Sequence, residues 1–148
     1  MRYLGLDIGD RWIGVALSDP QGMLASPLAV IARKNDPQAI DDIKGLIKKH
    51  DVALIVAGLP RLMNGTLGQQ AVKVQNFVAS LTGHIGVPIE FRDERLTTAM
   101  AKRLKRDTKF RKNRKIRSDS AAAALILQGY LDEQSERLRA DRVDADTF

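Results

Sequence analysis

The stretch Tyr3–Asp19, YLGLDIGDRWIGVALSD, contains two apolar runs on either side of a Gly-Asp turn. In each run apolar residues alternate with other residues at the period of a β-strand. The two runs and the turn between them predict a β-hairpin. Asp7 lies inside the first run, and a carboxylate in a buried strand is costly to desolvate unless it is paired, protonated or bound to a metal ion. We therefore expect a partner for Asp7 elsewhere in the chain.

The composition is that of a soluble globular protein: 148 residues, of which 44% are hydrophobic and 28% are charged. There is no apolar run of about 18 residues and no basic and apolar leader at the N-terminus, so we expect a cytoplasmic protein that does not bind a membrane. The sequence contains no Cys, and His50 and His84 lack the spacing of metal ligands. Any bound metal ion would therefore have oxygen ligands.

Basic residues are concentrated between residues 102 and 117, where ten Lys and Arg residues face one acidic residue. This basic segment has a formal charge of +9, whereas the rest of the chain has a formal charge of −3. Such a segment is typical of a surface that meets a polyanion, most commonly a nucleic acid. A solvated charged loop is the plainer alternative. An anionic lipid surface is less favoured, because the segment has few apolar residues.

Beyond the hairpin, hydrophobic periodicity and turn residues predict three more strands and four helices. The expected elements are a strand at residues 24–32, a helix with Asp36 as its N-cap, a buried strand at 52–57, a helix with an apolar stripe from Leu67 to Leu81, a strand at 88–92, a short helix from Thr97 or Thr98, and a buried helix that begins at Ser118 or Asp119.

Without the short helix, the order of the elements is β-β-β-α-β-α-β-α. This order predicts an α/β fold with a mixed five-stranded sheet flanked by helices. Strands that follow a crossover helix are expected to run parallel to the first strand, and ligands bind at the carboxyl ends of such parallel strands. Asp7, Gly58 and Glu94 fall at or near this edge. We expect residues 1–135 to form a single domain and residues 136–148 to form a flexible tail, because the hydrophobic pattern ends there.

Three acidic residues are candidates for a metal-dependent site: Asp7, Glu94 and Asp119. Phosphodiester hydrolysis by a two-metal mechanism needs clustered carboxylates that hold two divalent cations about 3.5–4 Å apart. Mg²⁺ or Mn²⁺ suits a site with oxygen ligands only. Each acid also has a plainer interpretation: Asp119 could cap its helix, Glu94 could be a solvated turn residue, and Asp7 could pair with Arg11 or Arg95.

Four segments carry motifs of a known family: GLDIGDRWIGVALSD (5–19), VAGLPRLMNGTLG (56–68), FRDERLTTAMA (91–101) and IRSDSAAAALILQGYL (116–131). They resemble the signature blocks of the pre-16S rRNA nuclease family, also called YqgF or Holliday-junction-resolvase-like, which has a ribonuclease H-like fold. The resemblance implies a metal-dependent nuclease site in which Asp7, Glu94 and Asp119 form the acidic triad. It also implies a role in maturation of the 5′ end of 16S rRNA, with Holliday junction resolution as the older proposal for the family.

Asp10 departs from the family pattern, in which a small, polar or basic residue commonly precedes the Arg. It adds a negative charge close to the proposed acidic triad. Two interpretations of the Asp10 side chain remain: it binds a metal ion, or it simply faces the solvent.

The sequence thus predicts a metal-dependent endonuclease for structured RNA, with pre-16S rRNA, alone or in a pre-ribosomal particle, as its substrate. Branched DNA is the alternative substrate and would favour a dimer; we expect a monomer or a weak homodimer. A noncatalytic RNA-binding factor and a nucleotide-binding fragment of the sugar-kinase and actin superfamily are the other hypotheses. Short length and the lack of a P-loop weaken the last one. The residues expected to bind nucleic acid are Arg11, Arg95, Lys105, Arg106, Lys109, Arg111, Lys112, Arg114, Lys115 and Arg117.

Replacing four residues of the basic segment with Ala tests its predicted contact with RNA. The variant should bind RNA more weakly, and its log–log salt dependence should flatten by roughly 0.7 for each single-strand phosphate contact that is lost. Anisotropy titrations at several salt concentrations measure this slope, and an unchanged slope would eliminate the role. The four substitutions are Lys109→Ala, Arg111→Ala, Lys112→Ala and Arg114→Ala.

Overall fold

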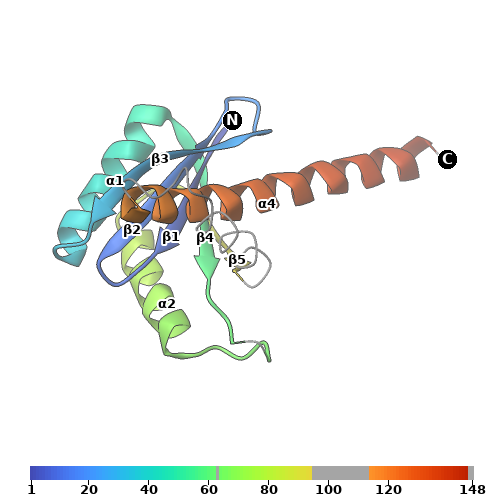
Figure 1. Ribbon diagram of the computed structural model, residues 1–148. Coiled ribbons are helices and arrows are strands. Elements are labelled where there is room, and N and C mark those ends of the chain that lie inside the picture. The colour runs from blue at the N-terminus through green and yellow to red at the C-terminus, as the bar shows by residue number, and fades with distance from the viewer. Residues whose placement is uncertain (63, 95–113, 147–148) are drawn as a thin grey trace.

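The computed structural model describes residues 1–62, 64–94 and 114–146. Five strands form one sheet in the order β3-β2-β1-β4-β5 (Figure 1). Within the described residues no helix is both long and apolar enough to cross a membrane. The strands are β1 (Arg2–Ile8), β2 (Trp12–Ser18), β3 (Ala25–Ala32), β4 (Val52–Leu59) and β5 (Ile89–Asp93), and the helices are α1 (Asp36–His50), α2 (Gln69–Thr82) and α4 (Arg114–Asp146).

The pairing of the strands confirms the predicted mixed sheet. β1 and β2 form the expected antiparallel hairpin, in which Asp7 lies opposite Gly14. β4 is the parallel neighbour of β1, and β5 is the parallel neighbour of β4. The carboxyl ends of these three strands therefore meet at one edge of the sheet. The short helix expected from Thr97 or Thr98 lies outside the described residues.

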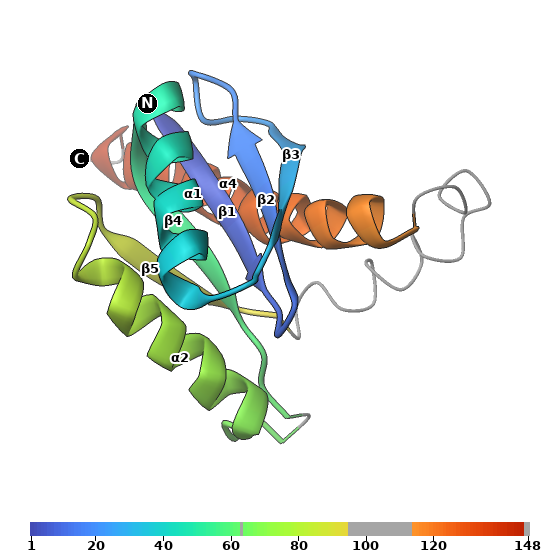
Figure 2. The ribbon, with the colours of Figure 1, turned by 90° about the vertical axis from the view of Figure 1, so that its left-hand side faces the viewer.

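Helices cover both faces of the sheet: α1 and α2 lie on one face and α4 on the other (Figure 2). The alternation along β1 divides its side chains between these faces, as the period of a strand requires. Leu4, Leu6 and Ile8 are buried in the larger core, which α1 and α2 complete. The opposite face carries a smaller core, formed by Ala16, Val56, Ala123, Ile126, Leu127 and Leu131.

Two helix starts differ from the prediction. Asn35, and not Asp36, is the N-cap of α1: its side chain accepts a hydrogen bond of 2.9 Å from the backbone N–H of Gln38. The Asp36 carboxylate instead pairs with Nε of Arg33 at 3.0 Å. α2 begins at Gln69, so Leu67 precedes the helix and is exposed, whereas we expected it to open the apolar stripe.

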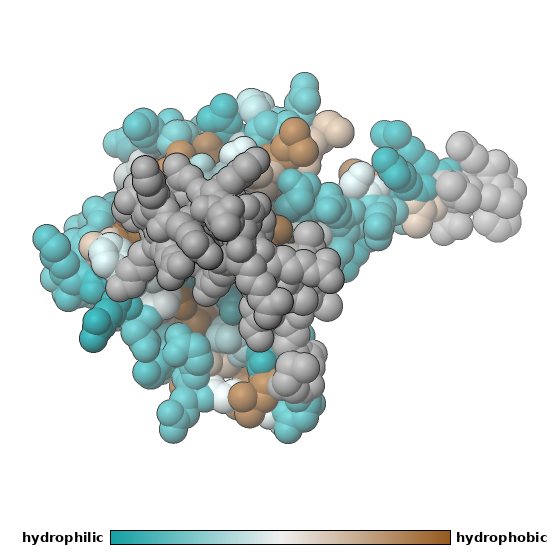
Figure 3. Space-filling view, in the orientation of Figure 1, coloured by the Kyte–Doolittle hydropathy of each residue, from teal (hydrophilic) through white to brown (hydrophobic). Residues whose placement is uncertain are grey.

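α4 is longer than predicted at both ends. It begins at Arg114, before the expected Ser118 or Asp119, so the end of the basic segment is helical. It also continues to Asp146, so residues 136–146 of the expected tail are helical. At 1.5 Å per residue, the 33 residues of α4 span about 50 Å. Its last turns extend away from the sheet (Figure 1). The part of this extension that Figure 3 colours is mostly hydrophilic, so no apolar periodicity marked it.

Glycines on the sheet allow α4 to lie directly against it. A methyl group at Gly5 would lie 2.8 Å from the carbonyl oxygen of Ala123, and one at Gly14 would overlap the carbonyl oxygen of Asp119. The backbone of a helix can approach a strand this closely only where the strand has no side chain. This packing holds the backbone of Asp119 against Gly14 of β2, the residue that lies opposite Asp7.

Gly14→Ala should therefore destabilise the protein by about 1–3 kcal/mol, since α4 must move off the sheet to accommodate the methyl group. Urea denaturation followed by circular dichroism measures the free energy of unfolding. Gly45→Ala is the matched control: Gly45 lies on α1 with open space around it, so the same change should stabilise the helix by up to about 1 kcal/mol. Equal effects of the two substitutions would contradict the close packing.

Candidate active site

Two carboxyl groups meet at the carboxyl ends of the parallel strands. Asp7 is the last but one residue of β1, and Glu94 directly follows β5. The backbone N–H of Glu94 donates a hydrogen bond of 3.1 Å to the carbonyl oxygen of Leu59, which fixes Glu94 at the end of β4. The side chains of Glu94 and Asp7 are joined by a hydrogen bond. The structure therefore brings two of the three predicted acids into contact.

Gly58 makes room for this contact. β4 lies between β1 and β5, so the two carboxyl groups come from strands about 9–10 Å apart. Leu6 pairs with Ala57, which places Gly58 next to Asp7 on the intervening strand. A methyl group at Gly58 would overlap Oε1 of Glu94. Because Gly58 has no side chain, Glu94 lies across β4 and reaches Asp7.

The surroundings of Glu94 raise the pKa of its carboxyl group from 4.5 to about 8. Burial is the largest cause, followed by the negative charge of Asp7, the hydrogen bond with Asp7 and the charge of Asp93. At neutral pH Glu94 therefore keeps its proton and donates it to the Asp7 carboxylate. A cation bound at these two groups would replace the proton and remove the repulsion between them.

Asp119, the third predicted acid, is half-buried on α4, and its backbone packs on Gly14 opposite Asp7. Among the residues that the structure describes, no group of three or more His, Cys, Asp or Glu side chains is arranged to hold a metal ion. The role of Asp119 as a metal ligand stays a prediction. Asp7 and Glu94 alone fit a hard divalent cation, because Mg²⁺ is commonly held by one or two carboxylates together with waters and substrate phosphates.

The residues predicted to bind nucleic acid fall into three groups. Arg11 is exposed next to the turn between β1 and β2. Arg114, Lys115 and Arg117 lie on the first turns of α4. The remaining six lie outside the described residues: Arg95, Lys105, Arg106, Lys109, Arg111 and Lys112.

Two features of this region were not predicted from the sequence. Gly58 interrupts an otherwise apolar strand, VALIVAGL, which signals a close approach by another group but does not identify Glu94 as that group. Asp10 forms an ion pair of 3.6 Å with Nζ of Lys73 on α2. The Asp10 carboxylate, the group by which this chain departs from the family pattern, is thus directed toward α2.

A protein-family model described as "RuvX: Holliday junction resolvase" matches residues 1–133. The chain belongs to the RuvX family. Membership confirms the resemblance on which the expected fold and nuclease activity were based. A relative from Dehalococcoides mccartyi, named "Putative pre-16S rRNA nuclease", is 48% identical over 126 residues, which cover 85% of this chain and 94% of the relative. A relative of the same name from Clostridium botulinum is 48% identical over 138 residues, which cover 92% of this chain and the whole relative.

Solved structures confirm the ribonuclease H-like fold of this RuvX-family chain. Thermus thermophilus RuvC, in complex with a Holliday junction substrate, matches with a TM-score of 0.62 and 16% identity over 91% of this chain and 96% of that one. The yeast mitochondrial Holliday junction resolvase Ydc2 matches with a TM-score of 0.60 and 11% identity over 99% of this chain and 84% of that one. The family description and the names of the relatives agree with a nuclease, an enzyme that hydrolyses phosphodiester bonds.

The raised pKa of Glu94 predicts a pH-dependent effect of Glu94→Gln on stability in the absence of metal ions. Between pH 4.5 and 8 the folded protein keeps a proton on Glu94 that the unfolded chain has lost, so native stability falls as the pH rises through this window. Gln does not ionise, so the free energy of unfolding of the variant, relative to that of the native protein, should rise by about 2 kcal/mol between pH 6 and pH 8.

Urea denaturation in EDTA at several pH values measures this difference. Glu136→Gln is the matched control for replacing a carboxyl group with an amide, because Glu136 is exposed on α4. A stability difference for Glu94→Gln that stays constant across this pH range would show that Glu94 is ionised at neutral pH.

Proposed function

We propose that this protein is a divalent-metal-dependent endonuclease that processes the 5′ end of pre-16S rRNA. The observation that carries the proposal is the contact between Asp7 and Glu94 at the carboxyl edge of the parallel strands. A carboxyl group that is buried against a second carboxylate is unfavourable for stability, since both desolvation and repulsion oppose its ionisation. A site that binds a cation accounts for this arrangement.

Asp7 and Glu94 would bind Mg²⁺ or Mn²⁺ through their carboxylate oxygens, with Asp119 as a third ligand from α4. A bound divalent ion would supply the positive charge that activates water and stabilises the leaving oxygen. Glu94 must lose its proton before it binds the ion, so activity should rise as the pH rises toward 8. Arg11 and the basic segment would hold the phosphates that flank the scissile bond.

RNA is the proposed substrate because relatives that match this chain at 48% identity over nearly their whole length carry a name that refers to pre-16S rRNA. The protein would then work in the cytoplasm on a pre-ribosomal particle or its RNA, as a monomer or a weak homodimer. The description of the family names the Holliday junction instead, which makes four-way DNA the second candidate. Resolution of a junction requires two symmetric cuts and therefore a dimer.

Cleavage of a precursor 16S rRNA 5′ leader, compared with cleavage of a Holliday junction, tests the proposal. The native protein should cut the RNA in Mg²⁺ or Mn²⁺ and not in EDTA. Asp7→Asn should slow this cleavage by about a thousandfold, which corresponds to about 4 kcal/mol of activation free energy.

Asp41→Asn is the matched control, because Asp41 is exposed on α1, away from the acidic pair, and the variant should cut like the native protein. Cleavage of the junction alone would favour the resolvase. Binding of RNA without any cleavage, by both the native protein and Asp7→Asn, would favour a noncatalytic RNA-binding factor.

A further inference from the structure

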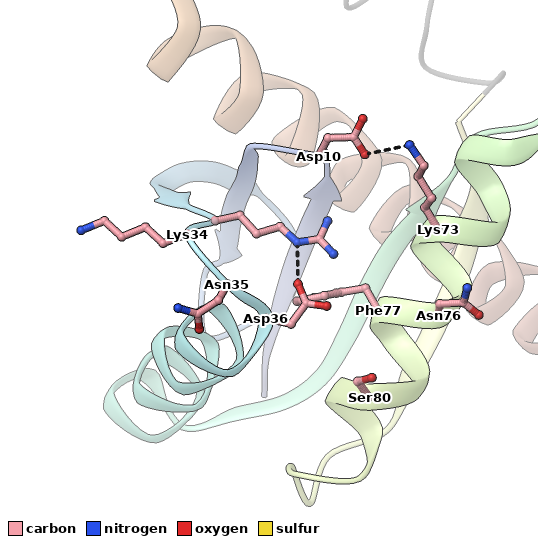
Figure 4. A pocket seen from close by; sticks show the side chains of 9 residues that line it. Asp10, Lys34, Asn35, Asp36, Lys73, Asn76, Phe77 and Ser80 are labelled. Atoms are coloured by element: carbon pink, nitrogen blue, oxygen red, sulfur yellow. Dashed lines mark hydrogen bonds and ion pairs between the residues drawn. The ribbon is translucent and has the colours of Figure 1, made fainter.

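A polar hollow of about 430 Å³ lies beside the turn between β1 and β2 (Figure 4). It is bounded by that turn, by the segment between β3 and α1, and by α2. Three cationic and two acidic side chains line it, so its formal charge is +1. The charged residues are Asp10, Arg33, Lys34, Asp36 and Lys73.

The Arg33 guanidinium is held rigidly at the wall of this hollow. Its Nε donates to the Asp36 carboxylate at 3.0 Å, and its Nη1 donates to the carbonyl oxygen of Gly9 at 2.8 Å. Its carbon Cζ lies 4.6 Å from the centroid of the Phe77 ring, which is a favourable cation–π distance. The guanidinium has five N–H donors, and Nη2 donates to no acceptor in the described part of the chain. An oriented cation with donors to spare is suited to bind an anion.

Lys73 supplies a second cation, from α2. Its Nζ lies 3.6 Å from Oδ1 of Asp10, and the two side chains are 58% and 60% exposed. Figure 4 shows this ion pair at the rim of the hollow, while Lys34 points away from it. Ion pairs this exposed contribute little to stability, so an incoming anion can displace the Asp10 carboxylate from Lys73 at low cost.

From these contacts we infer that the hollow is a phosphate subsite for the nucleic-acid strand, in which Arg33 and Lys73 bind a phosphodiester that competes with Asp10. The inference rests on the proposed function and extends it to a second part of the substrate. Asp10 thereby acquires a role: it weakens the subsite by occupying Lys73, and it does not bind the metal ion.

The position of the hollow suits a strand that also reaches the acidic pair. Asp7 and Asp10 are three residues apart, so the chain between them spans at most about 10 Å. Phosphates on one strand of a duplex follow one another at about 3.4 Å along the helix axis. A strand with its scissile phosphate at Asp7 and Glu94 can therefore place a phosphate a few nucleotides away in the hollow, by crossing the turn that contains Gly9.

The test is equilibrium binding of a fluorescently labelled fragment of the pre-16S 5′ leader, measured in EDTA so that cleavage plays no part. Lys73→Ala should weaken binding about fivefold and lower the log–log salt slope by roughly 0.7. Asp10→Asn should tighten binding about two- to fivefold, because it frees Lys73. Both side chains are more than half exposed, so the variants should fold normally.

The double variant, Asp10→Asn with Lys73→Ala, separates competition from a general change of charge. Once Lys73 is removed, Asp10→Asn should no longer tighten binding. Lys44→Ala and Asp41→Asn, at exposed positions of α1 outside the hollow, are the matched controls and should bind like the native protein.

Two results would overturn the inference: native affinity for Lys73→Ala, or a benefit of Asp10→Asn that persists without Lys73. The readout is independent of cleavage. If the protein binds RNA as described but never cuts it, the subsite stands and the proposed activity fails. If the protein cuts RNA and these variants bind like the native protein, the activity stands and the subsite fails.

Discussion

The contact between the carboxyl groups of Asp7 and Glu94 is the constraint on which the proposed chemistry depends. β4 lies between β1 and β5, so the Glu94 side chain must cross β4 to reach Asp7. It can cross because Gly58 has no side chain at that point. Burial and repulsion then keep Glu94 protonated, so that the two groups share one hydrogen bond in the absence of a cation. The sheet order, one glycine and one proton thus define the place where we propose that a divalent ion binds.

The two faces of the sheet contribute differently to this site. On one face, Gly5 and Gly14 allow the backbone of α4 to press against the strands, and this holds the backbone of Asp119 against β2, opposite Asp7. On the other face, the larger core packs α1 and α2 on the sheet and leaves the polar hollow at the same edge. Asp10 lines the hollow three residues after Asp7, so one edge of the sheet can contact a nucleic-acid strand at both places.

Local patterns predicted much of this fold. The alternation in Tyr3–Asp19 predicted the hairpin, and the crossover rule predicted the parallel neighbours of β1. The contact of Glu94 with Asp7 was expected only as proximity at one edge, because the passage across Gly58 depends on side-chain positions. The C-terminal extension of α4 was missed for a physical reason: its exposed residues 135–142 carry no apolar period. The pairing of Asp10 with Lys73 joins distant segments and has no local signal.

Crystals grown with Mn²⁺ in place of Mg²⁺ would test most directly whether Asp7 and Glu94 form a cation site. The account predicts an anomalous density peak about 2.1 Å from a carboxylate oxygen of each residue, with the hydrogen bond between them broken. Crystals of Asp7→Asn grown in the same way should lack the peak. The account would be contradicted if protein that cleaves RNA shows Mn²⁺ density only away from these two residues, with the Asp7–Glu94 hydrogen bond intact.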